Sequence, residues 1–96
     1  METKEIEDLF ERLAKQYGVS PEESKPIFTL LVKTTLKYRD MLIARGEKPL
    51  TVEETRAALD ELLHVMDKKS FSPNISPRIH ELVQLWHDEV KLFVYN

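Results

Sequence analysis

The pattern of apolar and polar positions predicts four helices, and one of them differs from the rest. Between residues 25 and 45, apolar side chains recur at helical spacing on two adjoining faces. A helix with so wide an apolar surface has to be covered on several sides. We therefore expect this second helix to be central in the fold. Its narrow polar strip consists of Thr29, Lys33, Lys37 and Asp40.

The other three predicted helices each show a single apolar stripe, which is typical of a helix with one face toward a core. They span about residues 3–17, 52–68 and 77–94. The short connection between the second and third helices favours antiparallel neighbours. The pattern therefore predicts an all-α fold, a four-helix antiparallel bundle that forms a single domain over residues 1–96.

Residues typical of helix ends mark the predicted boundaries. Ser20 and Thr51 each begin a capping box, because a glutamate follows three residues later in both cases. Gly18 is placed to end the first helix in the left-handed conformation, and Gly46 is expected to stop the second helix, which runs to about Arg45. Pro26 lies about five residues into this helix, where it removes a backbone donor. We therefore expect a short helical turn at 21–24 and then a kink or restart near Pro26.

Composition supports a globular protein and excludes several classes of function. The 96 residues are 42% hydrophobic and 32% charged, as in folded domains. The absence of cysteine excludes disulfides, thiol catalysis and zinc–thiolate sites. The net charge of −3 argues against non-specific nucleic-acid binding, which needs a basic surface. No apolar run approaches the roughly 18 residues of a membrane span and the first residues are acidic, so we expect a cytoplasmic protein without a membrane partner.

One short segment resembles a DNA-binding motif. Residues 13–20, LAKQYGVS, resemble the turn of a helix-turn-helix, in which a small residue is followed four positions later by glycine. The residues that follow do not suit DNA, because Glu22 and Glu23 would lie near phosphates and Pro26 interrupts the would-be recognition helix. A DNA-binding transcriptional regulator that uses residues 14–27 is therefore the alternative hypothesis, and we do not expect nucleic acid as the partner.

The three histidines do not show the spacing of a metal site. His80 and His87 are seven residues apart, which is roughly 10 Å along a helix, whereas two ligands on one helix prefer a spacing of four. Glu61 and His64 have the Glu-x-x-His spacing of ferritin-like sites, but we expect both on the polar side of their helix. We therefore predict no metal and no cofactor. A cross-helix site that joins His64 with His80 or His87 stays open.

No catalytic arrangement can be identified in the sequence. It shows no plausible Ser/His/Asp set, no glycine-rich phosphate loop and no pair of inward carboxylates. We therefore expect a non-enzymatic helical protein–protein interaction module with an adaptor or regulatory role.

Two rows of apolar residues exceed what a single-chain core needs. One row lies on the second helix beyond its main apolar face, and the other lies on the fourth helix. Exposed apolar patches usually mark an interface, and a symmetric homodimer is the commonest way to cover one. We therefore expect a protein partner, most simply a second copy of the chain. The candidate interface residues are Phe28, Val32, Leu36, Ile43, Leu85 and Leu92.

Overall fold

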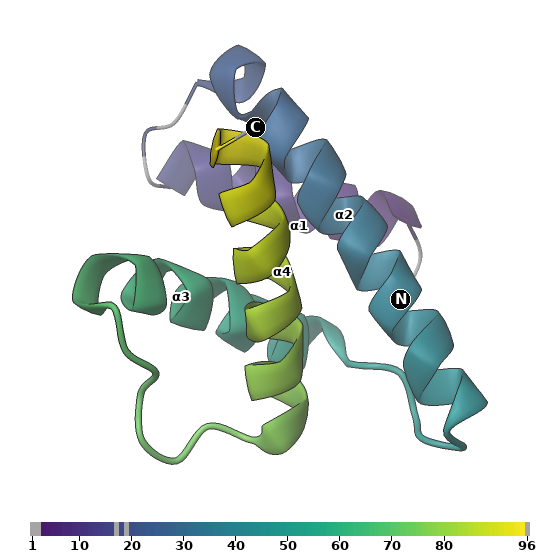
Figure 1. Ribbon diagram of the computed structural model, residues 1–96. Helices are drawn as coiled ribbons and strands as arrows, with labels where there is room; N and C mark the ends of the chain where they lie inside the picture. Colours follow the sequence, from purple (N-terminus) through teal and green to yellow (C-terminus); the bar gives the residue numbers. More distant parts are fainter. Residues whose placement is uncertain (1–2, 17, 19, 96) are drawn as a thin grey trace.

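Four helices account for most of the protein in the computed structural model, which describes residues 3–16, 18 and 20–95. The described residues contain no strand, so the predicted all-α, four-helix fold is confirmed. The helices are α1 (Thr3–Gln16), α2 (Pro21–Ala44), α3 (Val52–Lys68) and α4 (Pro77–Tyr95) (Figure 1).

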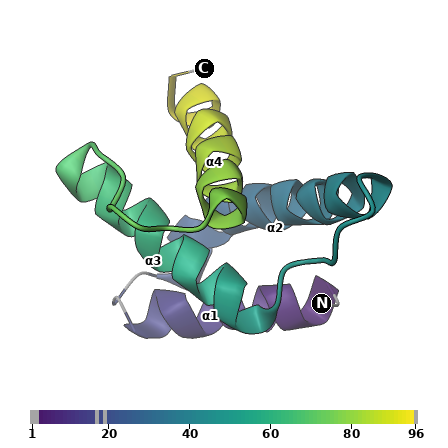
Figure 2. The ribbon, with the colours of Figure 1, turned by 90° about the horizontal axis from the view of Figure 1, so that it is seen from below.

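The second helix is central, as the apolar pattern predicts. α2 packs against both α1 and α4, and α3 packs against α4. The prediction that α2 and α3 are antiparallel neighbours is wrong, because α3 packs mainly on α4. Contacts between α2 and α4 pair late residues of one helix with early residues of the other, so the two helices run antiparallel. Seen along two directions, α3 and α4 cross and their C-terminal ends then separate (Figures 1 and 2).

The core takes buried apolar side chains from all four helices and from the α2–α3 linker. Trp86 lies at its centre with no exposed surface, and its ring meets that of Phe10 edge-on at a centroid distance of 6.0 Å. The buried cluster comprises Ile6, Leu9, Phe10, Leu31, Val32, Tyr38, Leu42, Leu50, Ala58, Leu59, Leu62, Val65, Leu82, Val83 and Trp86.

The two predicted capping boxes have different outcomes. At the start of α3, the Glu54 amide donates to Thr51 Oγ1 at 3.1 Å and the Thr51 amide donates to Glu54 Oε1 at 3.2 Å, which confirms the box. At the start of α2, the Ser20 side chain makes no cap hydrogen bond, so the box predicted there is wrong. Pro21 occupies the first helical position and fixes φ in the helical range, which lets the helix begin without that bond.

The kink predicted at Pro26 is also wrong, because α2 is one continuous helix across it. Near the N-terminus, the proline removes a single backbone bond, which would otherwise reach the Glu22 carbonyl. Downstream, Leu31, Tyr38 and Leu42 are all buried against the rest of the core. Burial of this length of helix offsets the loss of one bond.

Candidate functional site

Four of the six predicted interface residues are covered within one chain. Val32 is buried in the core, and Phe28, Leu36 and Leu85 are partly buried and pack against it. The cover arises because α1 and α4 both pack on α2. The sequence pattern showed that α2 has excess apolar surface, but it did not show that two neighbours would cover most of it.

The remaining two predicted interface residues do not lie together. Ile43 is 54% exposed and Leu92 is 58% exposed, but each lies near the C-terminal end of its own helix. Because α2 and α4 run antiparallel, these positions lie at opposite ends of the helix pair. The six residues therefore do not form one continuous surface.

A groove of about 570 Å³ lies between the second halves of α3 and α4. We call its apolar lining the floor and its polar lining the rim. The floor comprises Leu62, Val65, Met66, Phe71 and Val90. The rim comprises Lys69, Ser70, Gln84, His87 and Lys91. The sequence reasoning missed this site because its residues come from two helices and a loop, and none of them breaks the pattern of its own element.

A buried carboxylate holds the loop that borders the groove. Glu61 is 7% exposed, and its Oε1 accepts a hydrogen bond from the Ser72 amide at 2.6 Å. The expectation that Glu61 lies on the polar side of its helix is therefore wrong, because the returning loop covers it. The neighbouring Phe71 packs against the core and stacks on the His80 ring at a centroid distance of 3.9 Å. The loop is thus tied to both α3 and α4.

Lys69 closes α3 in an unusual backbone conformation. Its φ is +60°, in the left-handed region, and its amide donates to the Val65 carbonyl at 2.6 Å. Glycine or asparagine normally occupies such a position, because a larger side chain makes the left-handed conformation unfavourable. The residue at the groove's rim is therefore not the one that the backbone prefers.

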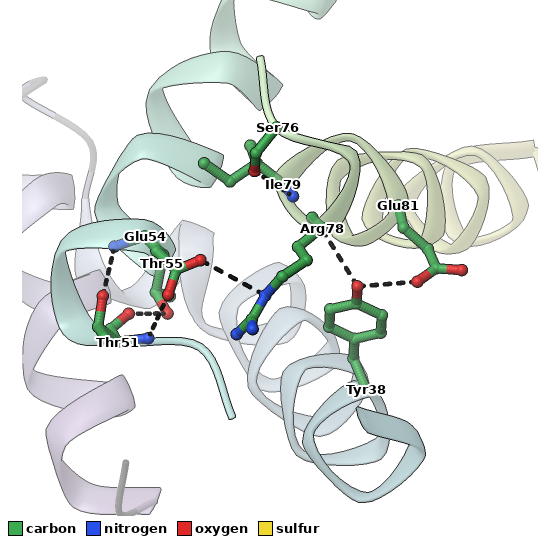
Figure 3. A network of polar contacts seen from close by, with 8 residues as sticks. All are labelled: Tyr38, Thr51, Glu54, Thr55, Ser76, Arg78, Ile79 and Glu81. Carbon is green, nitrogen blue, oxygen red and sulfur yellow. Dashed lines mark hydrogen bonds and ion pairs between the residues drawn. The ribbon is translucent and has the colours of Figure 1, made fainter. Parts of the chain in front are cut away.

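A polar network at the start of α4 ties this helix to α2 (Figure 3). The Tyr38 hydroxyl donates to Glu81 Oε1 at 2.8 Å and also lies 3.2 Å from the Arg78 carbonyl oxygen. The Arg45 guanidinium donates to both Glu81 oxygens, at 2.8 and 3.2 Å. Hydrogen bonds from Arg45 and then from Tyr38 lower the pKa of Glu81. Burial, followed by the bond to Glu81, raises the pKa of Tyr38.

The same region joins α4 to α3. Arg78 Nε lies 3.5 Å from Glu54 Oε2, and the Ile79 amide donates to Ser76 Oγ at 3.2 Å in the N-cap of α4 (Figure 3). Arg78 Nε and Nη2 are buried without a hydrogen-bond partner among the described residues. Every other member of the network is engaged with its own chain, so we assign this cluster to positioning α4 and not to binding.

The histidines lie in three different environments. His64 is partly buried on α3, His80 is exposed and stacked on Phe71, and His87 is partly buried at the rim of the groove. Among the residues that the structure describes, no group of three or more histidine, aspartate or glutamate side chains is arranged to hold a metal ion.

The segment that resembles a helix-turn-helix contributes to the α1–α2 corner. Gly18 has φ of +69°, as expected for a glycine that turns the chain after a helix. Glu22 and Glu23 are exposed at the start of α2, and Ile27 and Phe28 pack against the core. The would-be recognition helix thus begins with two acidic side chains on its surface.

Comparisons with known proteins give no match: no family model, no curated protein and no solved structure is similar to this chain. None of the described helices combines the length and the hydropathy needed to cross a bilayer. Inferences about function therefore rest on the groove and on the surfaces of the protein itself.

Proposed function

We propose that this protein is a small, non-enzymatic helical interaction module that binds a partner helix in the α3–α4 groove. The observation that carries the proposal is the apolar floor, in which Met66 is 54% exposed and Phe71 and Val90 are partly exposed, whereas Leu62 and Val65 are buried. The volume of the groove is about 570 Å³, which leaves room for a partner's side chains. Exposed apolar surface of this kind is unfavourable in water, and a partner's apolar side chains would remove it from solvent.

The dimensions of the groove suit a helix better than an extended strand. Its walls run from Leu62 to Lys69 and from Gln84 to Lys91. Each wall is about two helical turns, or roughly 10 Å, long. A helix that presents apolar side chains at positions i, i+3 or i+4, and i+7 places three anchors within this length. An extended strand would need the edge of a β-sheet, with unpaired backbone N–H and C=O groups, to pair with. The described residues of the groove walls belong to two helices and one loop, so they offer no such edge.

The test is an NMR titration of ¹⁵N-labelled protein with a designed amphipathic peptide of about four helical turns. The peptide carries leucine at the anchor positions and glutamine beside them. We expect chemical-shift changes that centre on the floor residues. The double variant Met66→Glu/Val90→Glu should remove them, because it places two charges in the floor.

A matched control separates this effect from a general change of charge. Leu63→Glu/Leu92→Glu alters the same two helices by the same charge at exposed apolar positions that do not line the groove. This control should bind the peptide as the wild type does. Shift changes elsewhere, equal loss in both variants, or no shift at millimolar peptide would contradict the proposal.

A second candidate function, self-association, is favoured by a groove of about 550 Å³ between α1 and α2. Its lining includes the predicted interface residues Phe28 and Val32. The charged residues that line it are Glu7, Glu11 and Lys15 on α1 and Lys25 on α2, so the acidic residues precede the basic one along α1. A two-fold axis across such a rim places the acidic end of one copy against the basic end of the other.

Sedimentation equilibrium with charge-reversed variants tests this second candidate. Lys15→Glu/Lys25→Glu and Glu7→Lys/Glu11→Lys should each weaken self-association, because either change makes the rim uniform in sign. An equimolar mixture of the two variants should restore association, since one rim is then wholly acidic and the other wholly basic. A wild-type monomer at every concentration up to hundreds of micromolar, or no rescue in the mixture, would reject the proposed interface.

A further inference from the structure

We propose that the partner of the α3–α4 groove is an amphipathic helix with acidic residues on both flanks of its apolar face. This inference rests on the proposed function of the groove and specifies the chemistry of its occupant. The rim carries Lys69 from the end of α3, and Lys91 and His87 from α4. None of the described residues that line the groove is a carboxylate. The rim is therefore basic in a protein whose net charge is −3.

Three carboxylates near the rim in sequence are engaged within the chain. A fourth, Glu89, is partly buried and does not line the groove. Glu61 accepts the Ser72 amide, and Asp88 accepts a hydrogen bond from Gln84 Nε2 at 2.9 Å. Asp67 pairs with Lys68 at 3.3 Å. By contrast, neither Lys69 nor Lys91 forms an ion pair with any of the described residues. A partner's carboxylates could therefore pair with the rim cations without displacing a bond that the protein already makes.

The position of the two lysines determines where the partner's acidic residues lie. Lys69 follows α3 and Lys91 lies on α4, so the two cations come from opposite walls of the groove. A helix whose apolar face lies on this floor brings the residues at the borders of that face next to the two ammonium groups. Acidic residues on both borders satisfy both cations, whereas a single acidic cluster satisfies one.

The backbone at Lys69 supports a role for its side chain. A left-handed φ of +60° is strained for lysine, and glycine would close α3 without that strain. The lysine has no described ion pair that would explain its presence structurally. Strain at a residue that carries a rim charge is the arrangement expected where a side chain serves binding and not folding.

The experiment compares three peptides that share one apolar face and differ at its borders, which carry glutamate, glutamine or lysine. Binding to ¹⁵N-labelled protein is measured by NMR titration at low and at physiological salt. We expect the glutamate peptide to bind roughly tenfold more tightly than the lysine peptide at low salt. The difference should shrink as salt screens the exposed charges.

Charge reversal in the protein sharpens the comparison. Lys69→Glu/Lys91→Glu should invert the preference, so that the lysine peptide binds more tightly than the glutamate peptide. The control Lys33→Glu/Lys37→Glu makes the same change of net charge at exposed positions of α2 outside the grooves described. It should leave the order of the three peptides unchanged. Lys91→Glu alone, at a position without backbone strain, checks that the inversion does not arise from altered folding at the end of α3.

The outcomes distinguish this inference from the proposed function. If the glutamine peptide binds in the groove but the three peptides do not differ, the groove binds helices and the acidic partner is rejected. If no peptide shifts the floor residues, the proposed function itself fails. An equal inversion in the α2 control would show that net charge, and not the rim, sets the preference, and would also overturn the inference.

Discussion

The two sides of α4 differ in how far their side chains are buried and hydrogen-bonded within the chain. Toward α2, the indole Nε1 of Trp86 donates to Thr35 Oγ1 at 3.0 Å and lies 3.2 Å from the Leu31 carbonyl oxygen, and the residue has no exposed surface. Toward α3, the second half of the helix borders an open groove whose lining includes Val90 and two lysines. We call the first region the seam and keep the name groove for the second.

The difference shows which region holds the fold together and which is available for a partner. In the seam, the apolar side chains are buried and the Trp86 indole has its hydrogen-bond partners. In the groove, Met66 is open to water, and neither Lys69 nor Lys91 forms an ion pair with a described residue. A partner can add interactions to the groove, whereas in the seam it would have to replace those already present.

The largest expected difference between the two regions is in the free energy of unfolding after one apolar residue of each is truncated to alanine. Leu31→Ala should lower the free energy of unfolding by about 2–5 kcal/mol, because it leaves a cavity in the seam. Met66→Ala should lower it by less than about 1 kcal/mol, because its side chain is more than half exposed. Urea unfolding followed by the fluorescence of Trp86, the single tryptophan, measures both. A loss below about 1 kcal/mol for Leu31→Ala would contradict the central place of α2.

A second prediction concerns the loop that borders the groove. Glu61→Ala should lower the free energy of unfolding by about 1–3 kcal/mol, because the Ser72 amide loses its partner in a partly buried place. Hydrogen exchange at the Ser72 amide should rise more than at core amides, since the loop opens locally. Glu53→Ala removes an exposed glutamate from the same helix and should change stability little. Equal effects of the two variants would show that the Glu61 bond does not hold the loop.

A third prediction uses the pH dependence of the network at the start of α4. Tyr38→Phe should cost about 0.5–1.5 kcal/mol at neutral pH, because one hydrogen bond to Glu81 is lost. The pKa of Tyr38 is raised in the folded state, so its contribution is complete below its unfolded value of about 10 and declines as pH rises above it. The wild type should therefore lose stability between about pH 9.5 and 11 relative to Tyr38→Phe. Parallel stability curves for the two proteins in that range would contradict this account.

Glu81 gives the opposite sign at acid pH. Its pKa is lowered in the folded state by Arg45 and Tyr38, so its contribution is present above the unfolded value of about 4.3 and is lost as pH falls below it. Glu81→Gln should therefore flatten the acid side of the stability curve. The control Glu53→Gln, at an exposed site with no described ion pair, should not.

The sequence predicted the elements of this fold better than its surfaces. The helical period, the capping box and the helix-ending glycine are all patterns of residues close together in the sequence. They were therefore enough to predict the all-α class, the start of α3 at Val52 and the end of α2 before Gly46. Whether Phe28 and Leu36 are exposed or covered depends on how α1 and α4 pack on α2. No local sequence pattern contains that information. The position predicted for Glu61 was wrong for the same reason, because the Ser72 amide that donates to its carboxylate lies 11 positions further along the chain.

The smallest expected change is the one that most directly separates stability from binding. Lys69→Gly should raise the free energy of unfolding by about 0.5–1 kcal/mol, because glycine adopts the left-handed φ without strain, although its greater freedom in the unfolded chain offsets part of the gain. Lys68→Gly, one residue earlier and inside α3, should instead lower it by about 0.5–1 kcal/mol. The same Lys69→Gly protein should bind the glutamate-flanked peptide more weakly, since one rim cation is gone. A variant that is both more stable and weaker in binding is the result expected if the lysine serves the groove at the expense of the helix end. A more stable variant with unchanged binding would show that the rim charge at this position has no part in recognition.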